Sequence, residues 1–349
     1  MRLAVNLGHW GAGNDRDSLV LAQEAERLGY DSVWAAEAYG ADAATVLAWV
    51  AAQTERIHVG SAAFQIPART PAMTAMTAAT LDGLSGGRFR LGLGISGPQV
   101  SEGWHGVRFD KPLGRTREYV EIVRLALARQ ALQYEGAHWT LPLPDGPGKA
   151  LTLSLRPVRE HVPVYLAAVG PKNLELAGEI ADGWLAIFFA PEHAAESTNH
   201  VHAGRKKAGR TDGPFDVVAT VPVVVDPDLE GAAAPLRHYT ALYIGGMGSR
   251  EQNFYNRLAV RMGYEQAAAK VQDLYLHRRH RDAAEAVPFE FIDRTSLIGS
   301  PARIKDRLSA YAEAGVTTLA LAPYAGSLEG RVSALRVLAE ALNSSGLGD

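Results

Sequence analysis

Short apolar runs alternate along the chain with longer segments of helical period. The runs VYLAAV (164–169) and TTLALA (317–322) are apolar almost throughout, which is typical of parallel strands covered on both faces. On this pattern we predict eight strands, at Arg2–Gly8, Asp31–Glu37, Ile57–Ile66, Arg88–Ser96, Pro163–Gly170, Trp184–Ala190, Phe215–Asp226 and Thr317–Pro323.

The segments between these strands have the spacing of amphipathic helices. After Ser300 and a proline, for example, Ile304, Leu308 and Tyr311 repeat on one helical face until Gly315. Eight strands, most of them followed by a helix, predict an α/β fold of the TIM (β/α)8 barrel type. An open, doubly wound sheet is the alternative.

Two segments interrupt the alternation, and we expect residues 1–349 to form one barrel domain that carries both as insertions. Residues 134–162, rich in Pro, Gly and His, precede the fifth strand. Residues 227–299, which contain the sequence IGGMGS, separate the seventh strand from the eighth. A long insertion at the working end of a barrel is often a lid, and added packing or a dimer surface is the alternative.

The fourth predicted strand contains two glycines, Gly92 and Gly94, whose positions lie on the same face. Glycine weakens a strand unless a ligand or a neighbouring backbone comes close to it. With Gly97 they match G-x-G-x-x-G, but Pro98 and a loop follow where a dinucleotide-binding helix would begin. A Rossmann site is therefore not favoured.

Composition narrows the function classes. The 349 residues include no cysteine, which excludes disulfides, thiolate metal sites and a cysteine nucleophile. The net charge of −3 gives no reason to expect nucleic acid or an anionic membrane as a partner. The sequence has no apolar run of about 18 residues and no signal peptide, so we expect a cytoplasmic protein. Paired glycosidase carboxylates and the H-E-x-x-H, G-x-S-x-G and P-loop motifs are also missing.

Several polar residues follow the predicted strands, where barrel enzymes carry their chemistry. Glu37 ends the second strand and is either catalytic or part of an ion pair or helix cap. His9 ends the first strand beside an aromatic residue, and His105 follows the fourth, where it is placed to act as a general acid. The histidine-containing runs HVH and HRRHRD lack zinc-ligand spacing, and we predict solvated helix faces for both.

The fifth strand ends at Gly170, and a helix begins directly at Pro171-Lys172-Asn173. The free backbone N–H groups and the dipole of such a helix favour a phosphate, to which Lys172 or Asn173 adds a side-chain contact. An ordinary βα turn is the alternative.

Several of these motifs together resemble one family. The sequence LSGGRFRLGLG, with VGSAAFQIPARTPAMTAMTAATLD before it and SGPQVSEGWHG after it, is similar to the bacterial-luciferase-like superfamily, most of all to its coenzyme F420-dependent oxidoreductases. VYLAAVGPKNLELAGEIADGW and SREQNFYNRLA extend the resemblance over nearly the whole chain. It implies a TIM barrel, often a homodimer, with a flavin-type ring in its mouth.

The resemblance also implies a non-proline cis peptide within Ala62-Ala63-Phe64 and a phosphate site at Gly170–Asn173. The sugar-phosphate dehydrogenases of this branch carry Asp-His after strand two and Glu after strand four. This chain has Glu37-Ala38 and Gly97-Pro98 there instead, so we do not expect that reaction.

We therefore expect hydride transfer between deazaflavin C5 and a small organic substrate, with Glu37, His9 and His105 as candidates for proton transfer. An FMN-dependent monooxygenase and a non-catalytic flavin-binding protein are the alternatives. The aromatic residues at the strand ends favour an apolar substrate. The residues expected to hold the coenzyme are Ala62, Ala63, Phe64, Gly92, Gly94, Ser96, Gly170, Pro171, Lys172, Asn173 and Arg250, the last within a closing segment, 247–257.

Overall fold

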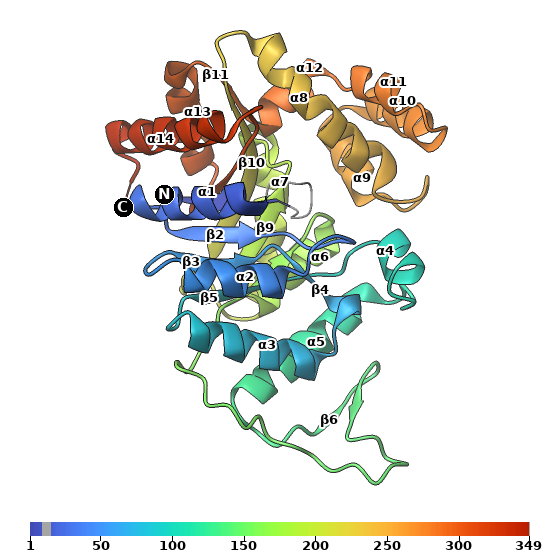
Figure 1. Ribbon diagram of the computed structural model, residues 1–349. Helices are drawn as coiled ribbons and strands as arrows, with labels where there is room; N and C mark the ends of the chain where they lie inside the picture. The colour runs from blue at the N-terminus through green and yellow to red at the C-terminus, as the bar shows by residue number, and fades with distance from the viewer. Residues whose placement is uncertain (9–14, 349) are drawn as a thin grey trace.

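The computed structural model of the protein describes residues 1–8 and 15–348. Its strands form a closed parallel ring in the order β1, β2, β3, β5, β8, β9, β10, β12 and back to β1 (Figure 1). The eight ring strands are β1 (Arg2–Asn6), β2 (Ser32–Ala35), β3 (His58–Ser61), β5 (Phe89–Gly94), β8 (Val164–Ala167), β9 (Gly183–Ile187), β10 (Asp216–Val225) and β12 (Thr318–Pro323). The predicted TIM barrel is confirmed, and closure excludes the open sheet.

Helices surround this ring, and polar side chains fix where several of them begin. Asp42 and Thr70 accept hydrogen bonds from backbone N–H groups in the first turns of α2 and α3, and Ser300 does so for α13 as predicted. The helices outside the long insertion are α1 (Asp15–Arg27), α2 (Ala43–Ala52), η1 (Ile66–Ala68), α3 (Pro71–Leu84), α4 (Pro98–Gly103), α5 (Pro112–Leu127), α6 (Pro171–Ile180), η2 (Pro191–His193), α7 (Ala194–Lys207), α13 (Pro301–Glu313) and α14 (Leu328–Ser345). Among the described residues, no helix is both long and apolar enough to cross a membrane.

Side chains fill the interior of the barrel. Trp34 is fully buried there, with its ring edge-on to Tyr165 at a centroid distance of 5.2 Å. A Cβ at Gly60 would lie 2.4 Å from the Trp34 ring, so glycine is needed for the indole to fit. The interior cluster consists of Ala4, Trp34, Tyr165, Leu185, Val218 and Ala320.

The N-terminal end of the barrel is closed by paired charges. Arg90 reaches both carboxylate oxygens of Asp31, at 2.6 and 3.1 Å, and Arg2 lies 3.0 Å from Asp216. The Tyr165 hydroxyl donates to Asp216 at 3.0 Å. Because each buried charge here is paired, this end is structural and leaves the C-terminal end for chemistry.

The two predicted insertions are present. Residues 134–162 contain a short hairpin, β6 (Tyr134–Glu135) with β7 (Thr140–Leu141), which extends away from the barrel (Figure 1). Residues 227–299 fold into α8 (Leu229–Ala241), the π-helical turn η3 (Leu242–Gly246), α9 (Phe254–Arg261), α10 (Glu265–Leu276), α11 (His280–Glu285), α12 (Phe289–Thr295) and β11 (Leu297–Gly299), with β11 pairing to β10 outside the ring. This insertion has an apolar core of its own, which includes Phe291 and Ile292.

Candidate active site

The C-terminal mouth of the barrel is floored mainly by small side chains. Alternate strand residues point the same way, so the positions two beyond the interior cluster, and two beyond the inward-facing glycines Gly60 and Gly92, face the mouth. All of these positions are half-buried, which places them at an accessible surface. They are Asn6, Ala36, Ala62, Gly94, Ala167, Ile187, Thr220 and Ala322. A floor with so few large side chains suits a planar group.

The edge after β3 is irregular at this floor. β3 pairs Gly60 with Arg90, whereas β4 (Phe64–Gln65) pairs Phe64 with Leu93, so β3–β4 has one more residue than β5 over this interval. The bulge contains a cis peptide bond between Ala62 and Ala63, within the predicted segment. The bulge therefore brings backbone and small side chains to the mouth.

The two glycines of β5 have different roles. A Cβ at Gly92 would lie 1.9 Å from the Ser61 carbonyl oxygen, and the Ser61 hydroxyl bonds both the N–H and the C=O of Gly92. Glycine is therefore needed at position 92 because the Ser61 backbone packs against it. Gly92 was expected to contact the coenzyme, and the structure instead gives it a packing role below the floor. Gly94 faces the floor, between Ala63 and Ala167.

Phe64 also differs from the expectation. Its side chain is fully buried in the layer between barrel and helices, 6.2 Å from Phe89 by ring centroids. The Arg69 guanidinium lies 4.6 Å above the Phe64 ring. Phe64 thus packs outside the barrel wall, because successive strand residues face opposite sides.

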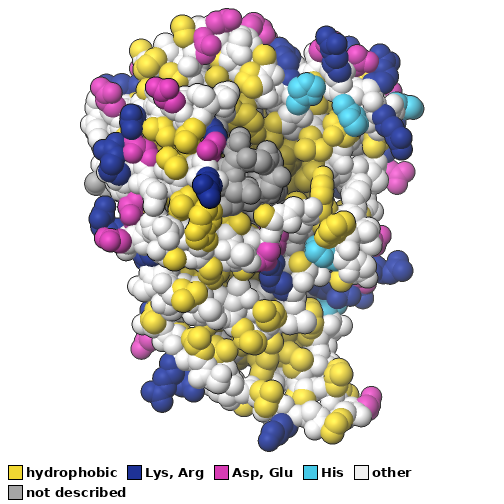
Figure 2. Space-filling view, in the orientation of Figure 1, with side chains coloured by type: hydrophobic (Ala, Val, Ile, Leu, Met, Phe, Trp, Pro, Cys, Tyr) yellow, Lys and Arg dark blue, Asp and Glu magenta, His cyan; other side chains and the backbone are white. Residues whose placement is uncertain are grey.

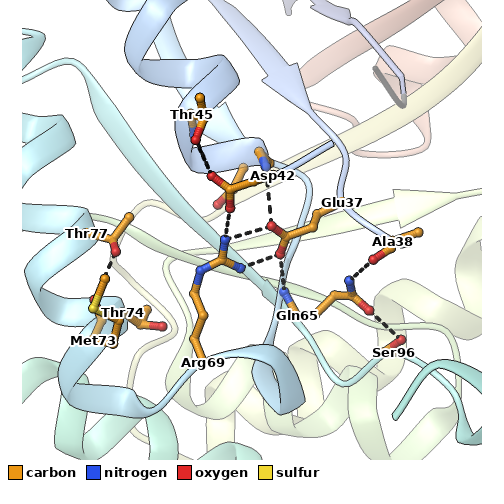
Figure 3. A network of polar contacts seen from close by, with 12 residues as sticks. Glu37, Ala38, Asp42, Thr45, Gln65, Arg69, Met73, Thr74, Thr77 and Ser96 are labelled. Atoms are coloured by element: carbon orange, nitrogen blue, oxygen red, sulfur yellow. Dashed lines mark hydrogen bonds and ion pairs between the residues drawn. The ribbon is translucent and has the colours of Figure 1, made fainter. Parts of the chain in front are cut away.

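Glu37 lies in an ion-pair network beside the mouth (Figure 3). Arg69 donates to both carboxylate oxygens, with Nη2–Oε1 at 2.8 Å, and also contacts Asp42. The backbone N–H groups of Ala43 and Gln65 donate to the same Glu37 carboxylate, at 3.3 and 3.1 Å. Only 7% of the Glu37 side chain is exposed, so its acceptor positions are occupied by protein. This geometry matches the ion-pair alternative.

Electrostatics keep this network charged. Burial by itself lowers the pKa of Arg69, but the hydrogen bonds and charge of Glu37, with Asp42, raise it above its usual value. Burial raises the pKa of Asp42, but hydrogen bonds from Thr45 and the Arg69 charge bring it below its usual value. The network is therefore a fixed ionic support for the loops around it.

The side chain of Gln65 links the Glu37 network to the loops at the floor of the mouth. Its side-chain amide donates to the Ala38 carbonyl at 2.6 Å and accepts from the Ser96 hydroxyl at 2.9 Å (Figure 3). Ser96 has a left-handed backbone, with φ of 59°, and follows Gly94 at the end of β5. The loops after β2 and β5 are thereby tied together through β4.

The predicted anion site is the N-terminus of α6, where Pro171 has no N–H and the Asn173 N–H already donates to the Gly170 carbonyl. α6 begins at Pro171, and its N-cap Gly170 provides no side-chain cap. The Asn173 side-chain amide donates a hydrogen bond to the Ala167 carbonyl at 3.3 Å. The Lys172 side chain is 80% exposed and forms an ion pair with Glu175. Backbone groups and the helix dipole, rather than these side chains, are therefore what the site offers an anion.

The long insertion contacts the loop after β5 at the mouth of the barrel. The Met247 carbonyl oxygen is the atom nearest to a Cβ built on Gly97, at 3.8 Å, and Phe254 at the start of α9 lies 6.3 Å from Phe109 in ring centroids. Loops after β5 and β10 thus meet over this end. Arg250, expected to bind the coenzyme tail, instead pairs with Asp273 of α10 at 2.8 Å, and both side chains are exposed.

Of the two histidine candidates for proton transfer, the structure describes only His105. His105 follows α4 and is half-buried, and its Nε2 is buried without a hydrogen-bond partner among the described residues. His9 lies outside the described residues, as does Trp10. Of the histidines in the HVH and HRRHRD runs, His202, His277 and His280 are exposed, and the described residues hold no group of side chains that could bind a metal.

Two features of the mouth were not predicted from the sequence. Asn6 donates to the Thr220 hydroxyl at 3.2 Å, linking β1 with β10 across the intervening β12. A polar residue ending an apolar strand is the signal that could have identified Asn6. The second feature is a group of tyrosines from distant segments, which no local pattern marks.

Comparisons with known proteins agree with this geometry. The profile of the family described as Luciferase-like monooxygenase matches residues 6–318. The chain belongs to this family. A candidate coenzyme F420-dependent oxidoreductase of Mycobacterium tuberculosis is 44% identical over 94% of this chain and 96% of the relative. The 5,10-methylenetetrahydromethanopterin reductase of Archaeoglobus fulgidus is 30% identical over 84% and 85%.

The fold comparison points the same way. The coenzyme F420-dependent tetrahydromethanopterin reductase from Methanopyrus kandleri has a TM-score of 0.80 with this chain, at 23% identity, over 97% of each chain. At this identity the match shows the fold alone. The sequence relatives confirm the predicted resemblance to the F420-dependent branch of the family.

Proposed function

We propose that this luciferase-like protein is a coenzyme F420-dependent oxidoreductase that acts on a small organic substrate. The observation that carries the proposal is the small-residue floor beside the bulge between β3 and β4, in a chain with relatives that are named for this coenzyme. When bound, F420 supplies a two-electron carrier that exchanges a hydride at C5 and, unlike a flavin, reacts poorly with oxygen.

The residues of the chain then act by holding and orienting. Ala62, Ala63 and Gly94 leave room for the ring face, and the N-terminus of α6 binds an anionic tail. A fixed geometry of this kind is worth several kcal/mol of a barrier, on the order of the effects known for well-oriented reactants. We assign Glu37 a positioning role through Gln65, and keep His105 and His9 as candidates for proton transfer.

The test is a titration of the coenzyme-free protein with oxidised F420 and with FMN, followed by tryptophan fluorescence. Trp34 lies fully buried just below the floor, so it should account for the largest part of the quenching. Trp34→Phe should remove that part, whereas Trp139→Phe, which alters the outer hairpin segment, should not. Submicromolar binding of F420 with weak binding of FMN supports the proposal.

Two other results would change it. Tight FMN binding with weak F420 binding would favour an FMN-dependent monooxygenase. Tight F420 binding with no coenzyme reduction or oxidation by any substrate would favour a non-catalytic carrier.

We also propose that the chain forms a homodimer through the outer face of α3. Met73 and Met76 are each 50% exposed, and Leu84 is 64% exposed on the same helix. Apolar side chains also gather on the lower half of the face in Figure 2. Light scattering should give twice the 37.4 kDa chain mass, and Met76→Glu should lower it. A monomeric wild type would contradict this.

A further inference from the structure

Four tyrosines from three separate parts of the chain meet beside the mouth. Tyr239 of α8, Tyr243 of η3 and Tyr255 of α9 come from the long insertion, and Tyr324 directly follows β12; we call these four the tyrosine cluster. Ring centroids lie 4.8 Å apart for Tyr239–Tyr243, 4.9 Å for Tyr243–Tyr255 and 5.9 Å for Tyr239–Tyr324. All four side chains remain half-buried.

The cluster stands on the rim of the barrel. Phe188, directly after β9, supports it from below, with its ring 5.6 Å from Tyr239 and 5.4 Å from Tyr243. Phe188 is buried and has a left-handed φ of 51°, which turns the chain at the strand end. Because Phe188 and Tyr324 both follow C-terminal strand ends, the cluster borders the same mouth as the small-residue floor.

The hydroxyls of this cluster differ from those of Tyr30 and Tyr165, which are bonded to strong acceptors. Tyr30 donates to the Leu335 carbonyl at 2.8 Å, and Tyr165 donates to a carboxylate at 3.0 Å. In the cluster, the Tyr239 and Tyr243 hydroxyls are hydrogen-bonded to each other, and the main charge-bearing neighbours of Tyr255 and Tyr324 are tyrosines. They are therefore partly exposed polar groups beside the mouth that make no hydrogen bond to a charged group or a backbone carbonyl of the described residues.

The electrostatic setting of the cluster is uncharged. Burial raises the pKa of Tyr239 well above its usual value, and the neighbouring hydroxyls of Tyr243, Tyr324 and Tyr255 raise it further. Burial also raises the pKa of Tyr243. Tyrosines are the main neighbours that act on these pKa values, whereas Tyr264, elsewhere in the insertion, is affected by Arg294 and Glu290. The four phenols are thus neutral donors at pH 7.

We propose that the tyrosine cluster is the substrate subsite of the mouth, and that it binds a neutral, flat, largely apolar molecule whose carbonyl oxygen accepts a hydrogen bond from Tyr243. Aromatic walls bind flat apolar surfaces well, and an anion would be desolvated there without a positive partner. Tyr243 is the central member, because it contacts Tyr239 and Tyr255 and affects the pKa of Tyr324. The inference rests on the proposed function, since it places a substrate beside the proposed coenzyme floor.

The test compares two probes of similar shape and different charge. Benzylideneacetone is a neutral conjugated ketone, and cinnamate is a carboxylate of similar outline. Calorimetric titration of F420-loaded protein should give at least tenfold tighter binding of the ketone. Tyr243→Phe should weaken ketone binding about fivefold to tenfold while leaving F420 affinity and the melting temperature unchanged.

Tyr264→Phe is the matched control, because it removes a phenol hydroxyl from the same insertion outside the cluster. Its ketone affinity should stay within twofold of wild type. Equal or tighter binding of cinnamate, unchanged ketone binding by Tyr243→Phe, or binding of neither probe at millimolar concentration would overturn the inference. The same probe titrations on coenzyme-free protein separate the two proposals. If the protein does not bind F420, the proposed function fails. The preference for the ketone over cinnamate still tests the subsite in that case.

Discussion

Gly92 and Gly94 lie two residues apart on one face of β5, yet alanine should strongly lower the stability of the protein at the first position and hardly change it at the second. At Gly92 the new Cβ would lie 1.9 Å from the Ser61 carbonyl oxygen and 2.7 Å from a Leu185 methyl carbon. At Gly94 it would lie 3.5 Å from the Ala63 Cβ and 3.6 Å from the Ala167 Cβ, which is ordinary contact.

The expected magnitudes follow from these distances. For Gly92→Ala, overpacking costs about 3 kcal/mol, because one of the close atoms is backbone and cannot rotate away. The backbone must move to relieve this overlap, and the movement also breaks the two Ser61–Gly92 hydrogen bonds, of 2.8 and 2.9 Å, at a cost of about 1 kcal/mol each. The total of about 5 kcal/mol is comparable with the whole stability of many proteins. For Gly94→Ala we expect a change within about 0.5 kcal/mol.

Urea unfolding followed by circular dichroism measures both free energies. Gly94→Ala should purify and unfold like wild type, and only its F420 affinity should fall, because the methyl group raises the floor. Gly92→Ala should be strongly destabilised or fail to fold. Equal stability of the two variants would refute the assignment of Gly92 to packing and Gly94 to the floor.

Three further outcomes are expected. Glu24→Gln should destabilise the protein at pH 7 but not near pH 2 in urea unfolding, because Arg27 and Arg336 lower the Glu24 pKa from 4.5 to about 2, so this stabilisation is lost as the pH falls through that window. Arg69→Gln should cost about 3 kcal/mol by leaving Glu37 buried and unpaired, and the double variant with Glu37→Gln should recover part of it; additive losses would contradict this. Trypsin cleavage after the exposed Arg250 should slow when F420 is added, and unchanged cleavage would argue against closure of 247–257.

Much of the architecture is encoded locally. Apolar runs at Val164–Ala167 and Thr318–Pro323 became ring strands, because parallel strands covered on both faces require continuous apolar side chains. Ser300 with Pro301 begins α13 as its sequence pattern predicts. The start of α6 at Pro171 was also predicted correctly from the sequence. These features depend on residues within one turn or strand of each other.

The composition of the site was decided by tertiary structure. The position of Glu37 at a strand end fits either a catalytic carboxylate or an ion pair, and the fold decides between them by bringing Arg69, 32 residues away, onto both of its oxygens. The different roles of Gly92 and Gly94 depend on which atoms lie opposite each one, a backbone carbonyl or small side chains, and spacing along β5 cannot show that. Likewise, the tyrosine cluster joins positions up to 85 residues apart, because barrel closure and the folding of the insertion bring them to one rim.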